Sequence, residues 1–171
     1  MMSQPLAERL RPKTLDDYIG QKHLVGQGAV LRKMIDAGRV PSFILWGPPG
    51  VGKTTLAQII ANKLDAPFYT LSAISSGVKD VREVIEKAKS NCFFNTVSPI
   101  LFIDEIHRFS KSQQDSLLNA VETGVVTLIG ATTENPSFEV IRPLLSRCQV
   151  YVLKSLDKND LLTLLHKAIA E

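Results

Sequence analysis

The segment from Ile44 to Ala61, ILWGPPGVGKTTLAQIIA, constrains the fold of this chain more than any other. Apolar residues come first, and a run of glycine and proline follows that the interior of a strand or helix would not tolerate. The stretch from Gly47 to Thr54 fits the pattern GxxxxGK followed by Ser or Thr, in which a loop joining a strand to a helix wraps around phosphates. This pattern predicts an α/β domain with a phosphate-binding loop.

The parts of this loop have separate physical roles toward a nucleoside triphosphate. Glycines lack a Cβ, so successive N–H groups can curl around a phosphate, and the helix starting near Gly52 adds the positive end of its dipole. Lys53 is expected to reach the β and γ phosphates, Thr54 to ligate Mg²⁺ and Thr55 to support the α phosphate. The expected nucleotide contacts of the loop are Gly47, Pro48, Pro49, Gly50, Val51, Gly52, Lys53, Thr54 and Thr55.

Short apolar runs and helical patterns alternate along the rest of the chain. The runs predict strands at residues 42–46, 68–71, 99–104, 125–131 and 149–153. Near-continuous apolar strands are typical of a parallel sheet that is covered on both faces. Helical spacing lies between them, as in Val81, Val84, Ile85 and Ala88, and again in Gln114, Leu117, Leu118 and Val121. The expected fold is therefore a three-layer α/β domain.

Composition restricts the class of protein only broadly. The chain has 171 residues, 44% of them apolar, which is enough for one folded domain with a sizeable core. It shows no secretory signal and no apolar run long enough to span a membrane, so we expect a cytosolic protein. The net charge of +3 permits a nucleic-acid partner without requiring one. Cys92 and Cys148 have no partner at metal-site spacing and are interpreted as reduced, partly buried thiols.

Two adjacent acids end the third apolar run. The sequence ILFIDEIH places Asp104 and Glu105 at the carboxyl end of a strand, the edge where open parallel sheets bind their ligands. Asp104 suits a role in holding Mg²⁺ through water, and Glu105 suits the polarisation of a hydrolytic water. Such acids can also merely cap a helix. His107 is more simply explained as structural, and Arg108 stays ambiguous.

Polar residues also follow the fourth run and precede the fifth. Thr132 and Thr133 end an apolar strand, where a hydroxyl could contact the attacking water and the γ phosphate. Arg147 ends a helical segment before the last strand, and its planar fork suits a transferring phosphoryl group. On spacing alone, two threonines before a turn are ordinary and Arg147 fits a surface ion pair better.

Two other nucleotide-binding classes fit the sequence less well. Residues 62–65, NKLD, match a guanine-binding pattern, but they lie one helix after the phosphate loop instead of after a later strand. We therefore treat that match as chance. A small-molecule kinase would leave Asp104, Glu105 and the strand-ending threonines without an evident use.

In this order, the phosphate loop, the acidic strand, the threonine-ended strand and the SR pair resemble the ATPase core of the AAA+ superfamily. Residues 10–21, LRPKTLDDYIGQ, are similar to the segment that clamp-loader subunits and branch-migration motors wrap over adenine. Residues 76–83, SGVKDVRE, 104–118, DEIHRFSKSQQDSLL, and 130–140, GATTENPSFEV, resemble the replication-associated recombination protein A family, whose eukaryotic relatives are the Werner-helicase-interacting proteins. The similarity covers nearly the whole chain.

The resemblance implies a five-stranded parallel sheet in the order 5-1-4-3-2 and specific roles for several residues. Thr133 would sense the γ phosphate, Arg147 would complete the site of a neighbouring subunit in trans, and Ser72 would be a polar switch residue facing the catalytic glutamate. The catalytic set would be Lys53, Glu105, Thr133 and Arg147. The implied adenine pocket consists of Arg11, Pro12, Tyr18, Ile19 and Gly20.

The resemblance also divides the chain into an adenine-side segment at 1–20, an ATPase core at 21–154 and the start of a helical lid at 155–171. The final helical pattern begins with Asp157 and Asp160 at cap and N3 spacing, and it is more apolar than a solvated tail should be. Family members continue through the lid, which carries a second sensor arginine, and a C-terminal domain associated with tetramer formation. We therefore expect a fragment of a longer polypeptide.

The implied function is ATP hydrolysis with Mg²⁺ at stalled replication forks, in replication-coupled recombination and repair. Expected partners are forked or junction DNA, which would stimulate hydrolysis, replication proteins such as single-strand-binding protein, and further copies of the chain in a tetramer. No membrane partner is expected, and the protein would work in the cytoplasm at the nucleoid. The alternative is a nucleotide-gated, clamp-loader-like module that recruits replication proteins and hydrolyses ATP only for release.

Overall fold

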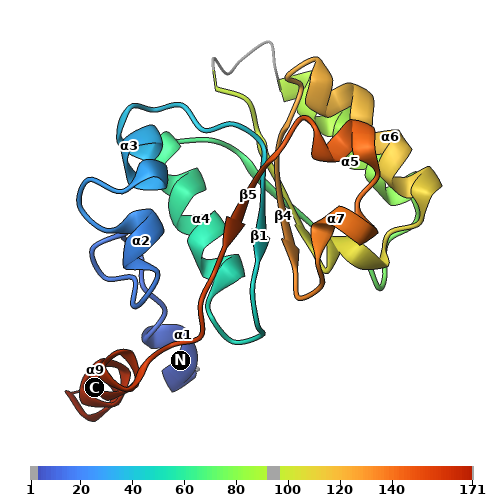
Figure 1. Cartoon of the computed structure of the whole chain (residues 1–171). Helices are drawn as coiled ribbons and strands as arrows, with labels where there is room; N and C mark the ends of the chain where they lie inside the picture. Colours follow the sequence, from blue (N-terminus) through green and yellow to red (C-terminus); the bar gives the residue numbers. More distant parts are fainter. Residues whose placement is uncertain (1–3, 92–96, 171) are drawn as a thin grey trace.

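The computed structural model describes residues 4–91 and 97–170, which build a five-stranded parallel sheet (Figure 1). The strands are β1 (Phe43–Trp46), β2 (Phe68–Ser72), β3 (Ile100–Asp104), β4 (Thr127–Thr132) and β5 (Gln149–Val152). Their order is β2-β3-β4-β1-β5, and every neighbouring pair is parallel. This is the expected order 5-1-4-3-2 read from the opposite edge, so the predicted fold is confirmed.

The three inner strands are the most apolar and the most deeply buried. In β1, β3 and β4 nearly every residue is buried, whereas the edge strand β5 exposes Val150 and Val152. In register, Trp46 of β1 pairs with both Thr132 and Val152, so the strands end at a common edge. Polar side chains that follow the inner strands are thereby gathered along that edge.

Helices cover both faces of the sheet and complete three layers (Figure 1). One face packs against α2 (Lys22–Val25), α3 (Val30–Asp36) and α4 (Lys53–Leu64). The other packs against α5 (Val78–Asn91), α6 (Lys111–Glu122) and α8 (Arg142–Leu145). Alternate residues of β3 serve the two faces: Phe102 packs with the first group and Ile103 with the second.

The predicted apolar stripes of α5 and α6 face the core. Val81, Ile85 and Ala88 are buried in α5, and Val84 is partly buried. The polar member of the α6 stripe, Gln114, is also buried. Its amide nitrogen donates to the carbonyls of Phe109 and Glu139, and its oxygen accepts from the Ile141 N–H. Full hydrogen bonding explains why a glutamine is tolerated there.

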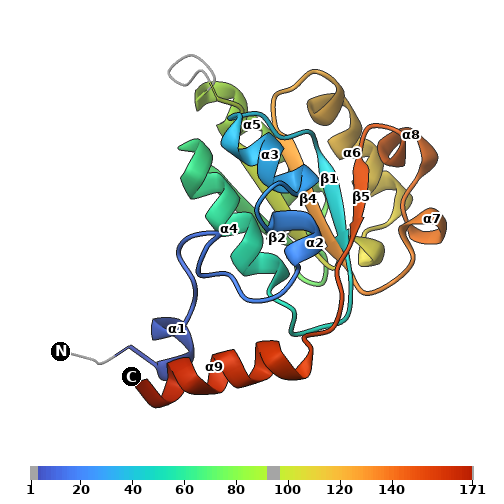
Figure 2. The same ribbon diagram turned by 60° about the vertical axis from the view of Figure 1, so that its left-hand side comes forward.

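Helix α9 (Lys158–Ala170) lies apart from the sheet, beside α1 (Leu6–Arg9), as both views show (Figures 1 and 2). Its start has the predicted reciprocal cap: the Asp160 N–H donates to Asp157 Oδ1 at 2.8 Å, and the Asp157 N–H donates to Asp160 Oδ2 at 3.1 Å. None of its residues is buried.

Two further expectations concern membranes and cysteines. Among the described residues, no helix has the length and apolar character needed to cross a bilayer. Cys148 is a free, partly buried thiol, and burial raises its pKa to about 12. Cys92 lies outside the described residues.

Candidate active site

A cavity of about 670 Å³ opens at the carboxyl ends of β1, β3 and β4. Most of its walls come from the phosphate loop and from the residues that follow β3 and β4, and α1 and the segment after it complete it. The lining residues are Ala7, Arg11, Pro49, Gly50, Gly52, Lys53, Thr54, Thr55, Asp104, Glu105, Thr132 and Thr133. The structure thus brings together residues that are far apart in the sequence.

The loop itself has the backbone that its glycines allow. Gly50 and Gly52 have φ angles of 79° and 88°, values that L residues rarely adopt, and α4 begins directly afterwards at Lys53. Gly47 does not line the cavity. It lies against β5, where an added Cβ would come within 2.7 Å of Leu153 Cβ and 3.0 Å of the Leu153 carbonyl oxygen. Val51 is buried in the core below the loop.

The Lys53 ammonium is held by the loop. Its Nζ donates to the carbonyl oxygens of Gly47 at 2.8 Å and Pro48 at 3.0 Å. Burial lowers the pKa of Lys53, and the nearby carboxylates of Asp104 and Glu105 oppose that shift. The ammonium group therefore lies in the cavity. A phosphate could replace the two carbonyls as the acceptor of its hydrogen bonds.

The two acids differ in environment although they are adjacent. Asp104 ends β3 and is exposed, whereas Glu105 has a φ of 53° and turns the chain into a short 3₁₀ helix, η1 (Ile106–Arg108). Glu105 Oε2 lies 3.2 Å from Arg108 Nε, but this atom is buried and makes no hydrogen bond within the described part of the chain. The two side chains therefore form an ion pair whose geometry does not make a hydrogen bond. The carboxylate oxygen is left able to accept a hydrogen bond from another donor.

The predicted switch residue lies near these acids without touching them by a hydrogen bond. Ser72 pairs in register with Asp104 and is exposed at the same edge of the sheet. In the described residues no hydrogen bond joins Ser72 to Glu105. The Glu105 carboxylate instead forms its ion pair with Arg108.

The two threonines after β4 also differ. Thr133, the predicted sensor, is exposed and lines the cavity. Thr132 is only 1% exposed, yet it lines the cavity as well, and its Oγ1 lies 2.9 Å from His107 Nδ1. In the sequence, Thr132 could not be given a role separate from that of Thr133. The sequence signal that could have pointed to Thr132 is its place as the last residue of an apolar strand. Ala7 also lines the cavity, but no sequence pattern singled it out.

The predicted adenine pocket is only partly assembled around the phosphate cavity. Arg11 lines that cavity, and its Nη1 lies 3.5 Å from Gln58 Oε1. Tyr18 instead lies beneath the loop, where its hydroxyl donates to the Val51 carbonyl at 2.8 Å and approaches that of Gly52 at 3.1 Å. Burial raises the Tyr18 pKa, so the phenol stays a hydrogen-bond donor.

The remaining members of that group lie elsewhere. Pro12 lines a neighbouring hollow together with Arg9 and Gln58. Gly20, with a φ of 84°, abuts the segment before α9 and the first turn of that helix, because an added Cβ would come within 2.8 Å of Leu156 Cδ2 and 3.6 Å of Asp160 Oδ2. Ile19, which joins it to Tyr18, is partly buried and lies outside the lining of the cavity.

Arg147 does not line the cavity of its own chain. It lies two residues after the end of α8, is exposed, and its Nε lies 3.7 Å from Glu122 Oε1 at the end of α6. This is the surface ion pair that spacing alone favoured, and such pairs contribute little to stability.

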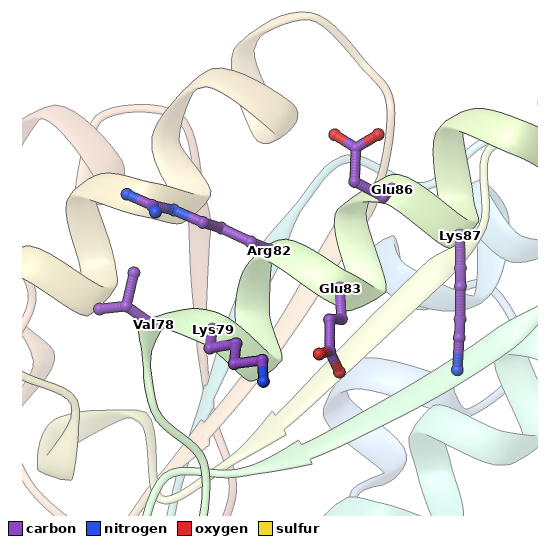
Figure 3. Close-up of a pocket in the computed structure, with 6 residues that line it drawn as sticks. All are labelled: Val78, Lys79, Arg82, Glu83, Glu86 and Lys87. Atoms are coloured by element: carbon purple, nitrogen blue, oxygen red, sulfur yellow. The ribbon is translucent and has the colours of Figure 1, made fainter.

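A second hollow of about 530 Å³ runs along the outer side of α5 (Figure 3). Its lining is Val78, Lys79, Arg82, Glu83, Glu86 and Lys87, a set of mixed charge. In Figure 3 the side chains of Glu83 and Lys87 extend to one side and that of Glu86 to the other, so they converge on no common point. None of the predicted site residues belongs to it.

Comparison with known proteins agrees with this geometry. The model of the family "ATPase family associated with various cellular activities (AAA)" matches residues 43–156. The chain is 53% identical to the replication-associated recombination protein A of Haemophilus influenzae over 98% of its length, and 52% identical to the ATPase WRNIP1 of Dictyostelium discoideum over 96%. It spans 37% of the former protein and 19% of the latter. The narrower resemblance found in the sequence is thereby confirmed.

Solved structures give the same result for the fold. The RuvB Holliday junction branch migration motor of Thermotoga maritima superposes with a TM-score of 0.76 at 32% identity, covering 94% of this chain and 54% of that one. The family match spans all five strands and the whole phosphate loop, and it ends just before α9. The chain therefore belongs to the AAA family of ATPases.

Proposed function

We propose that this chain is the ATP-hydrolysing core of a replication-associated recombination protein that acts on DNA at replication forks. The observation that carries the proposal is the single cavity in which the phosphate loop, Lys53, two adjacent acids and the strand-ending threonines meet. A binding module alone would need the loop, but it would have no evident use for a carboxylate on the opposite wall.

The loop would bind the triphosphate, and Lys53 would exchange its two carbonyl partners for β and γ phosphate oxygens. The donor set also fits Mg²⁺, because the Thr54 hydroxyl and the Asp104 carboxylate line the same cavity. Within residues 4–91 and 97–170, no cluster of three or more acids, histidines or cysteines could hold a metal alone. This suits an ion that takes its other ligands from phosphate and water, and that would neutralise charge on the transferring phosphoryl group.

Glu105 would orient and polarise the attacking water, and Thr133 would contact the γ phosphate. Within residues 4–91 and 97–170, the Glu105 carboxylate makes no hydrogen bond that would have to break first, and its one ion pair is the 3.2 Å contact with Arg108. Thr133 is exposed to the cavity from the neighbouring strand β4, so its hydroxyl is free to turn toward a phosphate. The residue that activates the attacking water and the residue that senses the γ phosphate would then lie at the same edge of the sheet.

Arg147 would complete the site of a neighbouring copy. Its exposure and its absence from the lining of its own cavity support a role in trans. The contact with Glu122 would have to be given up, at little cost because both side chains are solvated. A finger of this kind can raise turnover by about 10³ to 10⁵.

The names of the relatives support the setting in which this site would work. The name replication-associated recombination protein A refers to recombination at replication, and the name of the RuvB motor refers to a DNA junction. We propose that the whole protein is a tetramer, that forked DNA stimulates its hydrolysis, and that it works in the bacterial cytoplasm at the nucleoid. Single-strand-binding protein is a candidate partner.

Replacing Glu105 with Gln in the full-length protein tests the site. The amide keeps the size of the side chain but accepts no proton from water, so nucleotide binding should persist while turnover falls at least about 10²-fold. Steady-state phosphate release and equilibrium binding of ATP measure the two effects. Glu139→Gln, an exposed residue outside the cavity, is the matched control. Unchanged turnover in Glu105→Gln would remove Glu105 from the mechanism.

Subunit mixing tests the trans role of Arg147. Arg147→Ala subunits should be inactive alone, and Lys53→Ala subunits should be inactive for lack of nucleotide binding. Mixed together, they should recover activity, because an intact Lys53 site can receive an intact Arg147 from its neighbour. Absence of recovery at every mixing ratio would contradict the proposal for Arg147.

Junction DNA separates this function from a clamp-loader-like recruiting module. DNA with a single-strand to double-strand junction should raise the ATPase rate of the full-length protein above the rate with blunt duplex. A rate indifferent to DNA, combined with nucleotide-dependent binding of a replication protein, would favour the recruiting module.

A further inference from the structure

We propose that His107 is a positioning residue that sets the place of Glu105 relative to Thr133 through its hydrogen bond with Thr132. The inference rests on the proposed roles of Glu105 and Thr133, and it gives a use to a histidine that the sequence alone left as structural.

The turn that carries Glu105 is docked on the neighbouring strand β4 by two contacts. The first is apolar: Ile106 is fully buried and lies over Gly130, where an added Cβ would come within 3.2 Å of Ile106 Cδ1. A side chain at this position would require Ile106 to shift by a few tenths of an ångström. This contact fixes the distance between the layers, but apolar packing is non-directional and leaves sliding along the strand less restricted.

The second contact is directional. His107 Nδ1 lies 2.9 Å from Thr132 Oγ1. The threonine hydroxyl is itself held in place, because it accepts the Glu134 N–H at 2.9 Å and lies 3.2 Å from the Glu134 carbonyl oxygen. Its own proton can go to His107, or to Glu134 if the ring donates, so both neutral ring tautomers satisfy the pair. The position of the His107 ring is therefore restrained by a hydroxyl that is itself held in place.

The two ends of this bond are next to the residues that we assign to chemistry. His107 is two residues after Glu105, and Thr132 directly precedes Thr133. Glu105, Thr132 and Thr133 all line the cavity, and Thr132 is almost completely buried. The bond thus links the wall with the water-activating carboxylate to the wall that would contact the γ phosphate, and a shift of Thr133 would be passed to the turn that bears Glu105.

Loss of this link should affect turnover more than binding, because the loop and Lys53 hold the nucleotide from a different strand. Small misplacement of a catalytic group can lower a rate by about 10²-fold. The substitution His107→Phe keeps a flat ring of similar size and removes both nitrogens. In the full-length protein we expect kcat to fall about 10-fold to 100-fold while the Kd for ATP stays within about 2-fold.

Two companion substitutions test the chemistry of the bond. Thr132→Val removes the hydroxyl at constant size, and it should lower kcat like His107→Phe. The double variant His107→Phe, Thr132→Val should be no slower than the worse single variant, since the two residues act through one bond. His107→Asn can return a hydrogen-bonding atom near the former Nδ1, and it should recover part of kcat. His166→Phe, on the exposed side of α9, is the matched control and should leave kcat unchanged.

The outcomes separate this inference from the function it rests on. A kcat for His107→Phe within about 2-fold of the parent, while Glu105→Gln is inactive, would overturn the positioning role and leave the proposed function standing. Parallel losses of kcat, ATP affinity and thermal midpoint would assign His107 to stability alone and would also overturn it. Turnover in Glu105→Gln would instead contradict the proposed function itself.

Discussion

The phosphate edge, meaning the cavity-lining residues at the ends of β1, β3 and β4, and helix α9 are held in place in opposite ways. Behind the phosphate edge, side chains such as Leu45, Leu101 and Ile129 are completely buried. In α9 no residue is buried, and Leu165 and Ile169 are 60% and 81% exposed. The first region is fixed by packing on both sides of the sheet, and the second has almost none.

What holds α9 is a small set of polar and close contacts, made by the segment before the helix and by its last turn. The Gln21 side chain donates to the Lys154 carbonyl at 2.6 Å and accepts the Lys154 N–H at 2.9 Å, in the segment between β5 and α9. Gly20 abuts Leu156, and Lys167 donates to the Asp17 carbonyl at 3.2 Å. A region fixed by packing should respond strongly to added volume, whereas a region held by a few bonds should respond to single polar substitutions and little to apolar ones.

Of the substitutions that add volume, Gly47→Ala at the phosphate edge should have the largest effect. The new Cβ would meet Leu153 Cβ at 2.7 Å and the Leu153 carbonyl oxygen at 3.0 Å, and neither is the free end of a flexible side chain. Overpacking of this kind costs about 1 to 3 kcal/mol, and we expect a loss near the upper end of that range. Urea unfolding measures it.

Gly77→Ala is the matched control for that substitution. Gly77 is exposed, and an added Cβ there would approach only Asp80 Oδ2, at 3.9 Å. Its stability should change by less than about 0.5 kcal/mol, as is usual for surface positions. Equal losses of stability at the two glycines would mean that β5 can move away from the loop. Packing at this edge would then be looser than the buried side chains behind it indicate.

Where packing dominates, the sequence was a good guide. The five apolar runs matched strands because only buried parallel strands tolerate so many consecutive apolar residues. The phosphate loop was predictable because a local pattern specifies a local backbone, with Gly50 and Gly52 at positive φ. The order of the strands came from the family resemblance, since no local pattern states which strands are neighbours.

Where single long-range contacts dominate, sequence patterns were a poor guide. Tyr18 was expected at the adenine, yet its hydroxyl binds the loop carbonyls of Val51 and Gly52 from below. Gln21 adopts a left-handed backbone, with a φ of 56°, and reaches Lys154 across 133 positions. A pairing of this kind depends on how two segments meet in space, so neither residue type nor spacing announces it. The bond of Thr132 to His107 was missed for the same reason.

An intermediate effect is expected for Gln21→Ala. It removes both hydrogen bonds to Lys154, but the freed backbone groups belong to an exposed residue and can bind water, so the cost should be about 1 kcal/mol. The local effect should be larger, because amide hydrogens of α9 should exchange faster while those of β1 and β4 keep their protection. Hydrogen exchange with mass spectrometry measures both regions at once.

Gln27→Ala, at an exposed position in the same segment, controls for the loss of a glutamine. It should change neither stability nor exchange in α9. If the amide hydrogens of α9 exchanged as slowly in Gln21→Ala as in the parent, the hydrogen bonds of Gln21 would not be what holds the helix. The contacts with Gly20 and Asp17 would then be responsible.

The smallest effect is expected for apolar-to-charged substitutions in α9, although such changes are the most damaging ones at the phosphate edge. Leu165→Lys in this 171-residue chain replaces a side chain that is already 60% exposed, so the free energy of unfolding should change by less than about 0.5 kcal/mol. Leu56→Ala, at a completely buried position of α4, should cost about 2 to 5 kcal/mol by comparison. A loss above about 1.5 kcal/mol for Leu165→Lys would mean that α9 buries this face against the chain, since an exposed leucine has no such packing energy to lose. The ratio of the two losses therefore measures how far the buried sheet and the exposed helix differ in packing.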